Sequence, residues 1–373
     1  MSLKSDFMEF AERELKIPLV GIVAADDFSG ADMERLSFVQ KKFAEATPLS
    51  GGIETVFQPK DLLPEAKSVV IVGTPGFLGR MQSFEECRRE LLGCAEQSHV
   101  NVKYLQNNAE RSSKLTDFFT GKGCQCFSMT GGSFPIKLMA SKCGVGVYGK
   151  NAVILHPDYG SWITLGAFIT DAEMEPDQSM NDVCGKCDLC MRACPTNALS
   201  VPYRCDMTKC IDFHLGHNKK NIPHEIRAKC GNLLGEGCTV CRDACPKNRN
   251  LKKVEGYETP KELLYPPLFK IAEITDEEWD NGYAMTLMGF FLMDKKYLQR
   301  NAVLGLGNFH DERALPVLQS LLYNSDEELA GYAAWAAGMI GGEMARQMLN
   351  SALNRRTEDS IRSEIEFALS EAN

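Results

Sequence analysis

The chain has no long apolar run. Its 373 residues contain no uninterrupted apolar stretch close to the roughly 18 residues that suggest a membrane-spanning helix. The first residues, Met-Ser-Leu-Lys-Ser-Asp, also lack the apolar core of a signal peptide. The sequence therefore predicts a cytoplasmic protein that does not contact a membrane.

Net positive charge is missing as well. The chain has 41 Lys and Arg against 50 Asp and Glu, a net charge of −9, so its composition does not indicate a general nucleic-acid binder. Residues 204–253 depart from this balance with eleven basic and five acidic side chains, an excess of 11 − 5 = +6. This segment predicts a docking face for an acidic electron donor such as ferredoxin or flavodoxin, a contact with an RNA backbone, or a solvated face that compensates anionic clusters.

Cysteine, by contrast, is abundant, with fifteen residues in two dense runs. The first reads C-x2-C-x2-C-x3-C-P from Cys184 to Pro195, and the second reads C-x2-C-x3-C-P from Cys238 to Pro246. The first spacing is that of bacterial-type ferredoxins, in which the fourth cysteine of a run binds the other 4Fe–4S cluster. Structural zinc sites also use C-x2-C pairs, but they do not explain the two C-x3-C-P endings. Fifteen cysteines without a signal peptide argue against disulfides.

The spacing predicts two 4Fe–4S clusters with exchanged ligands. Each cluster takes four thiolates, so the seven cysteines of the two runs leave one ligand missing. We assign the first cluster to Cys184, Cys187, Cys190 and Cys245. We assign the second cluster to Cys194, Cys238, Cys241 and Cys210, with Cys205 and Cys230 as alternatives to Cys210.

The fold class predicted is α+β, in three domains. Residues 1–180 are expected to form an α/β cofactor-binding domain, residues 181–255 a ferredoxin-like two-cluster domain, and residues 256–373 a helical domain. Within the first, apolar patterning predicts a helix over 6–15, strands over 18–24 and 68–73, a helix over 85–98 and a strand over 100–105. In the last, the pattern around Arg300–Gly307 recurs 31 residues later at Gly331–Gly338, which predicts HEAT-like repeats.

Glycines are closely spaced between Gly144 and Gly166. Glycines between β segments let a backbone approach a flat ligand or another backbone. The stretch lacks the strand–GxGxxG–helix context of a dinucleotide site, so a Rossmann fold is not expected.

These features in this order resemble the epoxyqueuosine reductase family, which is related in its core to reductive dehalogenases. The resemblance covers about residues 60–373 and is strongest from 143 to 250. It rests on the two cysteine runs, Leu63-Pro64 to Val72, Gly144-Val-Gly146-Val-Tyr-Gly149-Lys150-Asn151, Gly160-Ser161-Trp162, Lys209-Cys210, Pro246-x-Asn248-Arg249 and Arg300-Asn301-Ala302.

The resemblance implies a cobalamin between the α/β domain and the cluster domain, where the near cluster reduces cobalt and the cobalt removes oxygen or halogen from a substrate. The residues it places along the corrin are Gly144, Gly146, Tyr148, Gly149, Lys150, Ser161 and Trp162. Tyr148 is the expected catalytic proton donor, because it resembles the tyrosine donor of the dehalogenases; Lys150 and His156 are the other candidates.

The sequence departs from the family at several positions. In the stretch Gly131-Gly132-Ser133-Phe134-Pro135, Gly132 stands where the family has its substrate-side aspartate. Val147 and Lys247 replace two tryptophans, a glycine–aromatic segment is missing around residues 45–58, and Tyr283 to Phe291 is apolar where tRNA-binding relatives are basic. Little or no epoxyqueuosine reductase activity is therefore expected, with cobalamin binding retained. The alternatives are an electron-transfer or partner-binding protein, and a genuine tRNA epoxyqueuosine reductase with a relocated acid.

Overall fold

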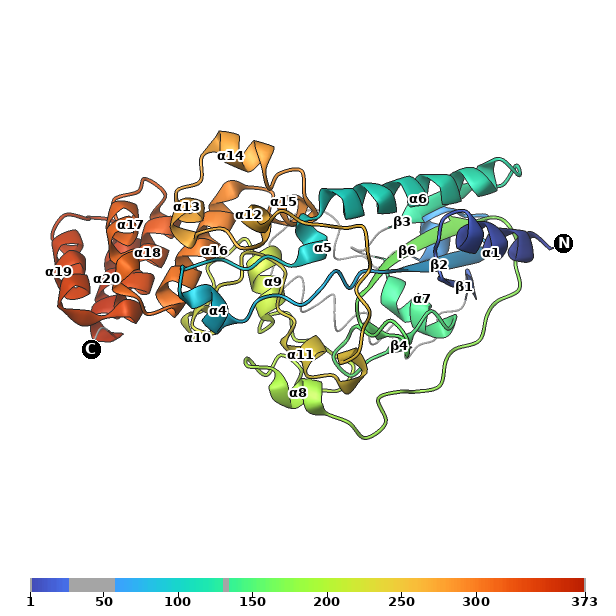
Figure 1. The fold of residues 1–373 in the computed structure, drawn as a ribbon, viewed down its shortest axis with the longest axis horizontal. Helices are drawn as coiled ribbons and strands as arrows, with labels where there is room; N and C mark the ends of the chain where they lie inside the picture. Colours follow the sequence, from blue (N-terminus) through green and yellow to red (C-terminus); the bar gives the residue numbers. More distant parts are fainter. Residues whose placement is uncertain (1, 27–57, 130–133, 372–373) are drawn as a thin grey trace. The chain divides into compact units, whose positions relative to one another are not determined.

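The computed structural model describes residues 2–26, 58–129 and 134–371 of the chain (Figure 1). They fall into two compact units, each assembled from three stretches of chain. Unit 1 comprises residues 1–79, 103–210 and 239–257, and unit 2 comprises residues 80–102, 211–238 and 258–373. The three-domain division at residues 180 and 255 stays a prediction. No helix in the described ranges is long and apolar enough to cross a membrane.

Unit 1 is built on a four-stranded antiparallel sheet with strand order β1-β2-β6-β3. The strands are β1 (Leu19–Ala24), β2 (Ser68–Pro75), β6 (Ile163–Thr170) and β3 (Cys126–Met129). The central strand β2 is buried on both faces, which explains its unbroken run of Val and Ile. The predicted strands over 18–24 and 68–73 are confirmed.

Both faces of this sheet are covered. The helices α1 (Leu3–Arg13) and α6 (Val102–Thr120) pack through Phe7 and Phe119 on the face that carries Val70. On the other face, α7 (Ile136–Lys142) and the hairpin β4 (Val147–Tyr148)–β5 (Ile154–Leu155) pack with Ile71. Successive side chains of a strand point to opposite faces, so β2 supplies both cores. The short helix α3 (Pro59–Leu62) leads into β2.

The cysteine runs of unit 1 lie on short helical turns. The first run leads into α8 (Leu189–Ala193), and the second contains α11 (Val240–Asp243) followed by the 3-10 turn η1 (Pro246–Asn248). Helix α8 packs against α11, so the two runs lie side by side.

Two predicted elements are wrong. The helix expected over 85–98 is broken into α4 (Phe84–Arg88) and α5 (Gln97–Val100), and the strand expected over 100–105 is mostly the start of α6. Between α4 and α5 the backbone pairs with other parts of unit 2: the N–H of Gly93 donates to Pro266 O (2.7 Å), and that of Cys94 donates to Asn232 O (2.8 Å). Tertiary hydrogen bonds therefore replace the helical ones that the apolar pattern predicted.

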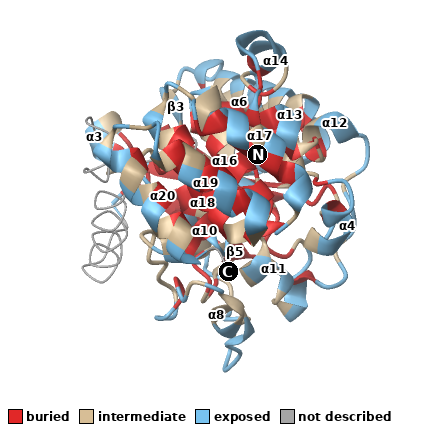
Figure 2. Ribbon diagram, turned by 90° about the vertical axis from the view of Figure 1, so that its left-hand side faces the viewer, coloured by how far each residue is buried: buried red, intermediate tan, exposed pale blue. Residues whose placement is uncertain are grey.

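Unit 2 is helical, and its core runs through the repeat helices (Figure 2). Ahead of the repeats lie α9 (Ile211–Gly216), α10 (His224–Arg227), α12 (Lys261–Leu264), α13 (Leu268–Ala272), α14 (Asp276–Asn281) and α15 (Leu287–Leu292). The repeats are α16 (Lys295–Asn308), the turn η2 (Glu312–Ala314) with α17 (Leu315–Leu321), α18 (Glu327–Ile340), α19 (Gly342–Leu353) and α20 (Asp359–Glu371).

Glycines at the same repeat position explain why the period is kept. A Cβ on Gly307 of α16 would lie 2.8 Å from Ala336 of α18, and a Cβ on Gly338 of α18 would lie 2.8 Å from Ala368 of α20. Each first helix of a repeat therefore packs closely on the next, which only a glycine at that position permits. The predicted HEAT-like stacking is confirmed in these helices.

Candidate iron–sulfur and cofactor site

The first cysteine run forms a tight loop ahead of α8. Gly185 has φ +50°, and a Cβ added there would meet no atom within 4 Å in the described chain beyond its neighbours, so backbone conformation rather than space requires the glycine. The Asp182 carboxylate accepts hydrogen bonds from the N–H groups of Cys184 (2.8 Å) and Gly185 (3.3 Å). Asp182 thus fixes the start of the loop.

Lys150 holds the same loop from the other side. Its Nζ donates to the carbonyl oxygens of Gly185 (2.6 Å) and Cys187 (2.8 Å). Its own carbonyl accepts a hydrogen bond from the N–H of Tyr203 (3.0 Å). Lys150 therefore ties the β4–β5 hairpin, which the resemblance places along a corrin, to the first cysteine run.

Cys245 of the second run lies near thiols of the first. Burial raises the pKa of Cys190, and the neighbouring Cys184, Cys245 and Cys187 raise it further. The pKa of Cys245 is likewise raised first by burial and then by Cys184 and Cys187. These mutual effects are compatible with an exchanged ligand, while no group of three or more His, Cys, Asp or Glu in the described residues is arranged to hold a single metal ion.

Cys194 sits among hydrogen-bond donors. Burial alone would raise the pKa of its thiol, but the Thr196 hydroxyl and the backbone N–H groups of Thr196, Ala198 and Leu199 together lower it. A group of donors around one sulfur stabilises a thiolate, the form that binds metal. Cys194 is therefore suited to be a ligand.

A buried asparagine joins the second run to the Gly160–Trp162 turn. Asn248 Oδ1 accepts from the Ser161 N–H (2.9 Å), while its Nδ2 donates to Ser161 Oγ (2.9 Å) and Arg242 O (2.7 Å). A Cβ on Gly160 would collide with this amide, and Gly160 has φ +57°. The Arg242 guanidinium lies 5.3 Å from the Trp162 ring centre, a cation–π contact.

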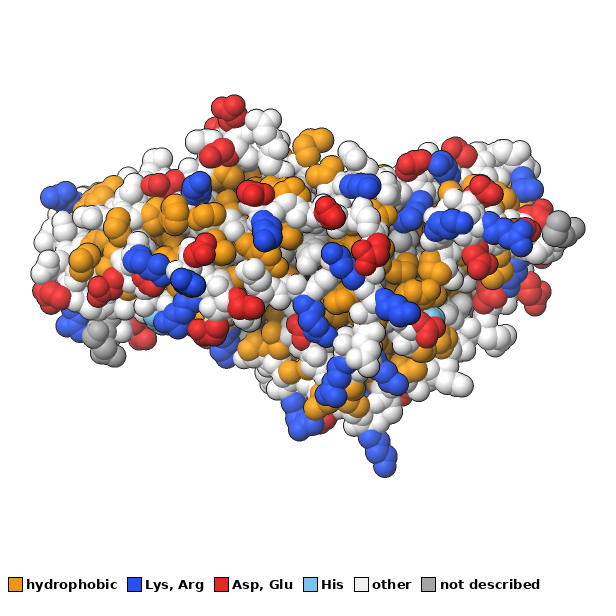
Figure 3. All heavy atoms as spheres, in the orientation of Figure 1, with side chains coloured by type: hydrophobic (Ala, Val, Ile, Leu, Met, Phe, Trp, Pro, Cys, Tyr) orange, Lys and Arg blue, Asp and Glu red, His pale blue; other side chains and the backbone are white. Residues whose placement is uncertain are grey.

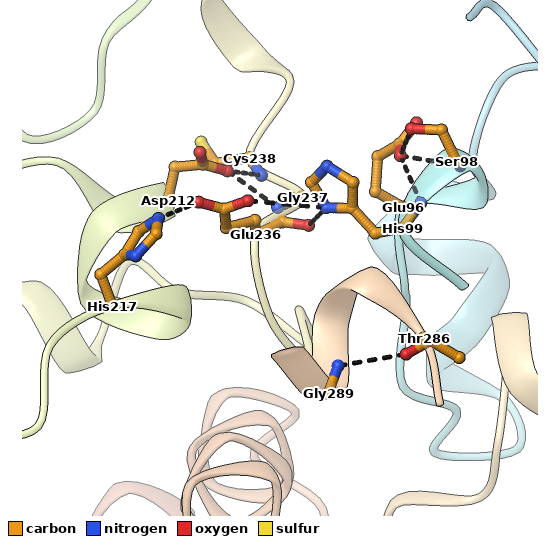
Figure 4. Close-up of polar contacts among 10 residues, drawn as sticks. All are labelled: Glu96, Ser98, His99, Asp212, His217, Glu236, Gly237, Cys238, Thr286 and Gly289. Atoms are coloured by element: carbon orange, nitrogen blue, oxygen red, sulfur yellow. Dashed lines mark hydrogen bonds and ion pairs between the residues drawn. The ribbon is translucent and has the colours of Figure 1, made fainter. Parts of the chain in front are cut away.

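In unit 2, Cys238 is held by polar side chains from several segments (Figure 4). Asp212 Oδ1 on α9 accepts from the N–H groups of Gly237 (2.8 Å) and Cys238 (3.0 Å). The adjacent Glu236 hydrogen bonds through its carboxylate to His217, and its backbone oxygen accepts from His99 Nδ1 (3.0 Å). The backbone that carries Cys238 is therefore fixed before any metal binds.

The candidates for the eighth ligand differ in burial. Cys230 lies in the hydrophobic core of unit 2, its Sγ donates to Ile226 O (3.3 Å), and burial raises its pKa to about 12. Cys205 and Cys210 are half-buried in unit 1. Cys230 is thus a core thiol by its surroundings, and Cys210 stays a prediction.

The glycines of the β4–β5 hairpin have packing explanations. A Cβ on Gly146 would lie 2.4 Å from Ile154, and one on Gly149 would lie 2.7 Å from the Asn151 side chain. Gly144 has φ +76° and would meet Gln178 O at 2.8 Å. Close approach within the chain therefore accounts for these glycines, and a corrin contact at the hairpin stays a prediction.

A cavity of about 990 Å³ opens in unit 1. Its lining includes the aromatic side chains of Phe77, Tyr159, Trp162 and Tyr257 and the basic side chains of Lys16, Arg111, Lys252 and Lys253. Of the seven residues predicted along the corrin, only Trp162 lines it.

The predicted proton donors lie in different settings. Tyr148 is half-buried and packs against the core beneath the sheet, and His156 accepts a hydrogen bond at Nδ1 from the Asp158 N–H (3.1 Å). Burial lowers the pKa of His156, although the charge of Asp158 opposes the shift. Gly132 and most of the segment 45–58 lie outside the described residues.

The basic segment 204–253 contains both exposed and buried cations. Lys and Arg side chains gather on the face over α8 and α11 (Figure 3). Lys247, Arg249, Lys252 and Lys253 of the basic segment are exposed. Arg227, in contrast, is buried, and the half-buried Lys219 Nζ donates to the carbonyls of Gly216, Phe291 and Leu292. Not all of the eleven cations are therefore available to a partner.

Sequence reasoning missed the residues that support the cysteines. The sequence patterns did not indicate a role for Asp182 or Asp212, and they included Asn248 only as part of a motif. Asp182 stands two residues before Cys184, a spacing at which a short acidic side chain caps a turn, so local reasoning could have found it. Asp212 lies 26 residues from Cys238, and no local signal connects them.

Comparison with known proteins assigns both cysteine runs and the repeats. Residues 183–248 match the family described as the 4Fe–4S double cluster binding domain, and residues 292–370 match the HEAT repeats. The first match supports two 4Fe–4S clusters rather than zinc sites.

Solved structures resemble the whole chain. A crystal structure of an epoxyqueuosine reductase with an epoxyqueuosine-modified tRNA-Tyr stem loop has a TM-score of 0.88 at 30% identity, covering 99% of this chain and 98% of that one. A Bacillus subtilis epoxyqueuosine reductase, solved with its catalytic aspartate loop swung out of the active site, has a TM-score of 0.86 at 30% identity, covering 100% and 99%.

Related amino-acid sequences show the same likeness as the solved structures. The Epoxyqueuosine reductase of Bacillus subtilis is 32% identical over 98% of this chain and 94% of its own length, and that of Listeria monocytogenes is 32% identical over 98% and 96%. By this likeness along its whole length, the chain belongs to the epoxyqueuosine reductase family, with a 4Fe–4S double-cluster domain and C-terminal HEAT repeats.

Proposed function

We propose that this chain is a cobalamin-dependent iron–sulfur reductase that removes oxygen or halogen from an organic substrate. The observation that carries the proposal is the match to epoxyqueuosine reductases along the whole chain. It is supported by the contacts that join the cysteine runs to the hairpin and the Gly160–Trp162 turn within unit 1.

The residues of unit 1 are compatible with a corrinoid. Cobalamin has a broad macrocycle and a nucleotide tail with a phosphate, so it needs a large cavity with apolar walls and some cations. The cavity near Trp162 has apolar walls that include Phe77 and Tyr257. Its lining carries the cations Lys16, Arg111, Lys252 and Lys253 beside the acidic Glu12, Asp158 and Glu255. When bound, cobalamin would supply a strongly reducing metal centre.

The iron–sulfur part of the proposal assigns ligands by the exchanged pattern. The first cluster takes Cys184, Cys187, Cys190 and Cys245, and the second takes Cys194, Cys210, Cys238 and Cys241. The shared environment of Cys190 and Cys245 supports the first set. Two clusters store one electron each, which matches the two electrons that the reaction consumes.

The reaction also needs protons. Opening an epoxide to an alkene takes two electrons and two protons and releases water, while replacing a carbon–halogen bond by carbon–hydrogen takes two electrons and one proton and releases halide. A positioned acid contributes roughly a hundred- to ten-thousand-fold to such a step. We assign this role to Tyr148, because Gly132 has no proton to give.

The second candidate function is reduction of epoxyqueuosine in tRNA itself, with Tyr148 or another acid in the place of the aspartate. The structural relative solved with a modified tRNA stem loop favours it. The glycine at position 132 and the apolar stretch 283–291 favour a different substrate, and we therefore rank it second. An electron-transfer protein without substrate chemistry is the third possibility.

One experiment separates these functions. The protein is purified anaerobically and reconstituted with iron, sulfide and cobalamin, and its visible spectrum is recorded. A bound corrinoid is expected, whereas a protein that takes up iron but no corrinoid contradicts the proposal and favours electron transfer alone. Incubation with epoxyqueuosine tRNA and a reductant, followed by mass analysis of nucleosides, then tests the substrate: little or no queuosine is expected, and robust turnover selects the second candidate.

A further inference from the structure

Lys150 has a role that neither the family likeness nor the proposed reaction assigns. Its half-exposed side chain does not line the cavity, and its Nζ donates to Gly185 O at 2.6 Å and to Cys187 O at 2.8 Å. Two of its three N–H donors are engaged by backbone of the first cysteine run. These contacts anchor the loop to Lys150.

We propose that Lys150 is a positioning residue of the first 4Fe–4S cluster, which fixes the loop carrying Cys184, Cys187 and Cys190 and whose positive charge favours the reduced cluster. The inference rests on the iron–sulfur part of the proposed function and does not require cobalamin.

The hydrogen bonds explain the positioning. In a trans peptide the N–H points opposite to the C=O. By holding the carbonyls of Gly185 and Cys187 on one side of the loop, Lys150 turns the N–H groups of Lys186 and Asp188 to the other side. Asp182 meanwhile takes the N–H groups of Cys184 and Gly185. The loop is thus fixed by a cation on its carbonyls and an anion on its amides.

The charge explains the expected effect on reduction. Each one-electron reduction adds one negative charge to the cluster, and a cation held nearby stabilises that charge. Two carboxylates of the same loop have other partners: Asp182 accepts hydrogen bonds from backbone N–H groups, and Asp188 pairs with Arg192 at 3.0 Å. Lys150 is half-exposed, so salt partly screens its charge.

The sequence offers a matched control in Lys186. It has the same charge and lies in the same loop, between Cys184 and Cys187, but its side chain is exposed. Lys150→Gln removes the anchor and the charge, Lys150→Arg keeps the charge, and Lys186→Gln removes an exposed charge only.

The full chain and these three variants are reconstituted anaerobically with iron and sulfide and titrated while electron paramagnetic resonance is recorded. In Lys150→Gln, we expect one cluster either to shift to a more negative midpoint potential or to be lost with about half of the iron. Lys150→Arg should retain both clusters, with a smaller shift than Lys150→Gln, and Lys186→Gln should match the wild type.

Lys150→Gln with full iron and both potentials unchanged would overturn the role, and so would an equal shift in Lys186→Gln. If Lys150→Arg, which keeps the charge, lost as much iron as Lys150→Gln, the positive charge of Lys150 would not be what retains the cluster. If the wild type itself binds no iron, the iron–sulfur function fails as well. That outcome is seen without any variant, so the two failures are distinguishable.

Discussion

Cys194 and Cys245 each end a cysteine run and precede a proline, which turns the chain away from the sulfur because it lacks an N–H and has a fixed φ. Under the exchanged-ligand assignment, each serves the cluster held mainly by the other run. The N–H donors around Cys194 and the thiols around Cys245 place these two residues in different electrostatic surroundings.

Replacing Cys194 by serine should therefore damage one cluster, and replacing Cys245 by serine should damage the other. Cys194→Ser should lose the cluster of Cys238 and Cys241, and Cys245→Ser the cluster of Cys184, Cys187 and Cys190, each with about half of the iron. Iron analysis and electron paramagnetic resonance of the reduced protein measure this. Cys230→Ala serves as the control and should keep all iron, since that thiol is buried in the core of unit 2. Full iron and an unchanged reduced spectrum in Cys194→Ser would refute the exchange.

Among the helices, α15 has a half-buried lysine at its C-terminal end. Lys219 Nζ donates to Phe291 O (2.8 Å) and Leu292 O (2.9 Å) at this C-terminus, where carbonyls have no helical partner. Burial, aided by the charge of Arg300, lowers its pKa from 10.5 to about 8. Within the basic segment 204–253, docking of an acidic donor would therefore depend on exposed cations such as Lys220 rather than on Lys219.

The lowered pKa predicts a specific pH dependence. Between pH 8 and 10.5 the unfolded chain binds more protons at Lys219 than the folded chain does, so this residue makes the protein more stable as pH rises through that window. Relative to Lys219→Met, the wild type should gain stability from pH 7.5 to 9.5 in urea titrations. Lys220→Met, which removes an exposed charge, is the matched control. A stability difference for Lys219→Met that does not change with pH would contradict the burial of its ammonium.

Helix α20 is attached to α10 by an ion pair. The Arg227 side chain is 1% exposed, and its NH1 and NH2 donate to the two carboxylate oxygens of Glu364 at 3.0 and 2.9 Å. His224 adds a hydrogen bond at 3.0 Å and stacks on Phe367. Burial alone would raise the pKa of Glu364, but Arg227, assisted by His224, lowers it overall.

Glu364→Gln should destabilise unit 2 at neutral pH by about 3 kcal/mol, because it leaves a buried guanidinium without its counter-charge. Since the native pKa lies below the ordinary 4.5, the stabilisation by Glu364 is present above that value and is lost as pH falls through the native pKa. Thermal unfolding from pH 7 to pH 3 should show the gap between wild type and variant closing in acid. Glu366→Gln, on the exposed side of the same helix, is the matched control and should leave the stability at neutral pH nearly unchanged.

In the whole molecule, each of the two units is made of three separate stretches of the chain. The core of unit 2 combines Leu91 and Val100 from its first stretch and Ile211 and Leu234 from its second with the repeat helices. A cut at the sequence-based boundary of residue 255 divides this core. The fragment 256–373 would expose apolar surface that residues 80–102 and 211–238 cover in the full chain.

Fragments 1–255 and 256–373 are therefore expected to bind a hydrophobic dye and to melt without a sharp transition, unlike the full chain. Circular dichroism and dye fluorescence measure this, and mixing the two fragments should restore part of the transition. A fragment 256–373 that melts cooperatively by itself would instead support the predicted three-domain division.

The amino-acid sequence by itself determined the features whose signal is local. Ligand spacing in C-x2-C loops, the 31-residue repeat and the apolar strands over 18–24 and 68–73 depend on near neighbours, so they identified the cluster domain, the HEAT-like helices and the sheet. Close packing also explains the repeat glycines, because every copy must meet its neighbour in the same way.

Which residues support these features depended on long-range folding. The helix expected over 85–98 gave way to hydrogen bonds from Gly93 and Cys94 to residues far along the chain. Lys219 lies in the basic segment of the sequence, and the structure shows its ammonium hydrogen bonded at the end of α15. Lys150 is placed along a corrin by the resemblance, and the structure shows its ammonium hydrogen bonded to the first cysteine run. A side chain's partner depends on what long-range folding brings within about 3 Å, and spacing along the sequence contains no information on that distance.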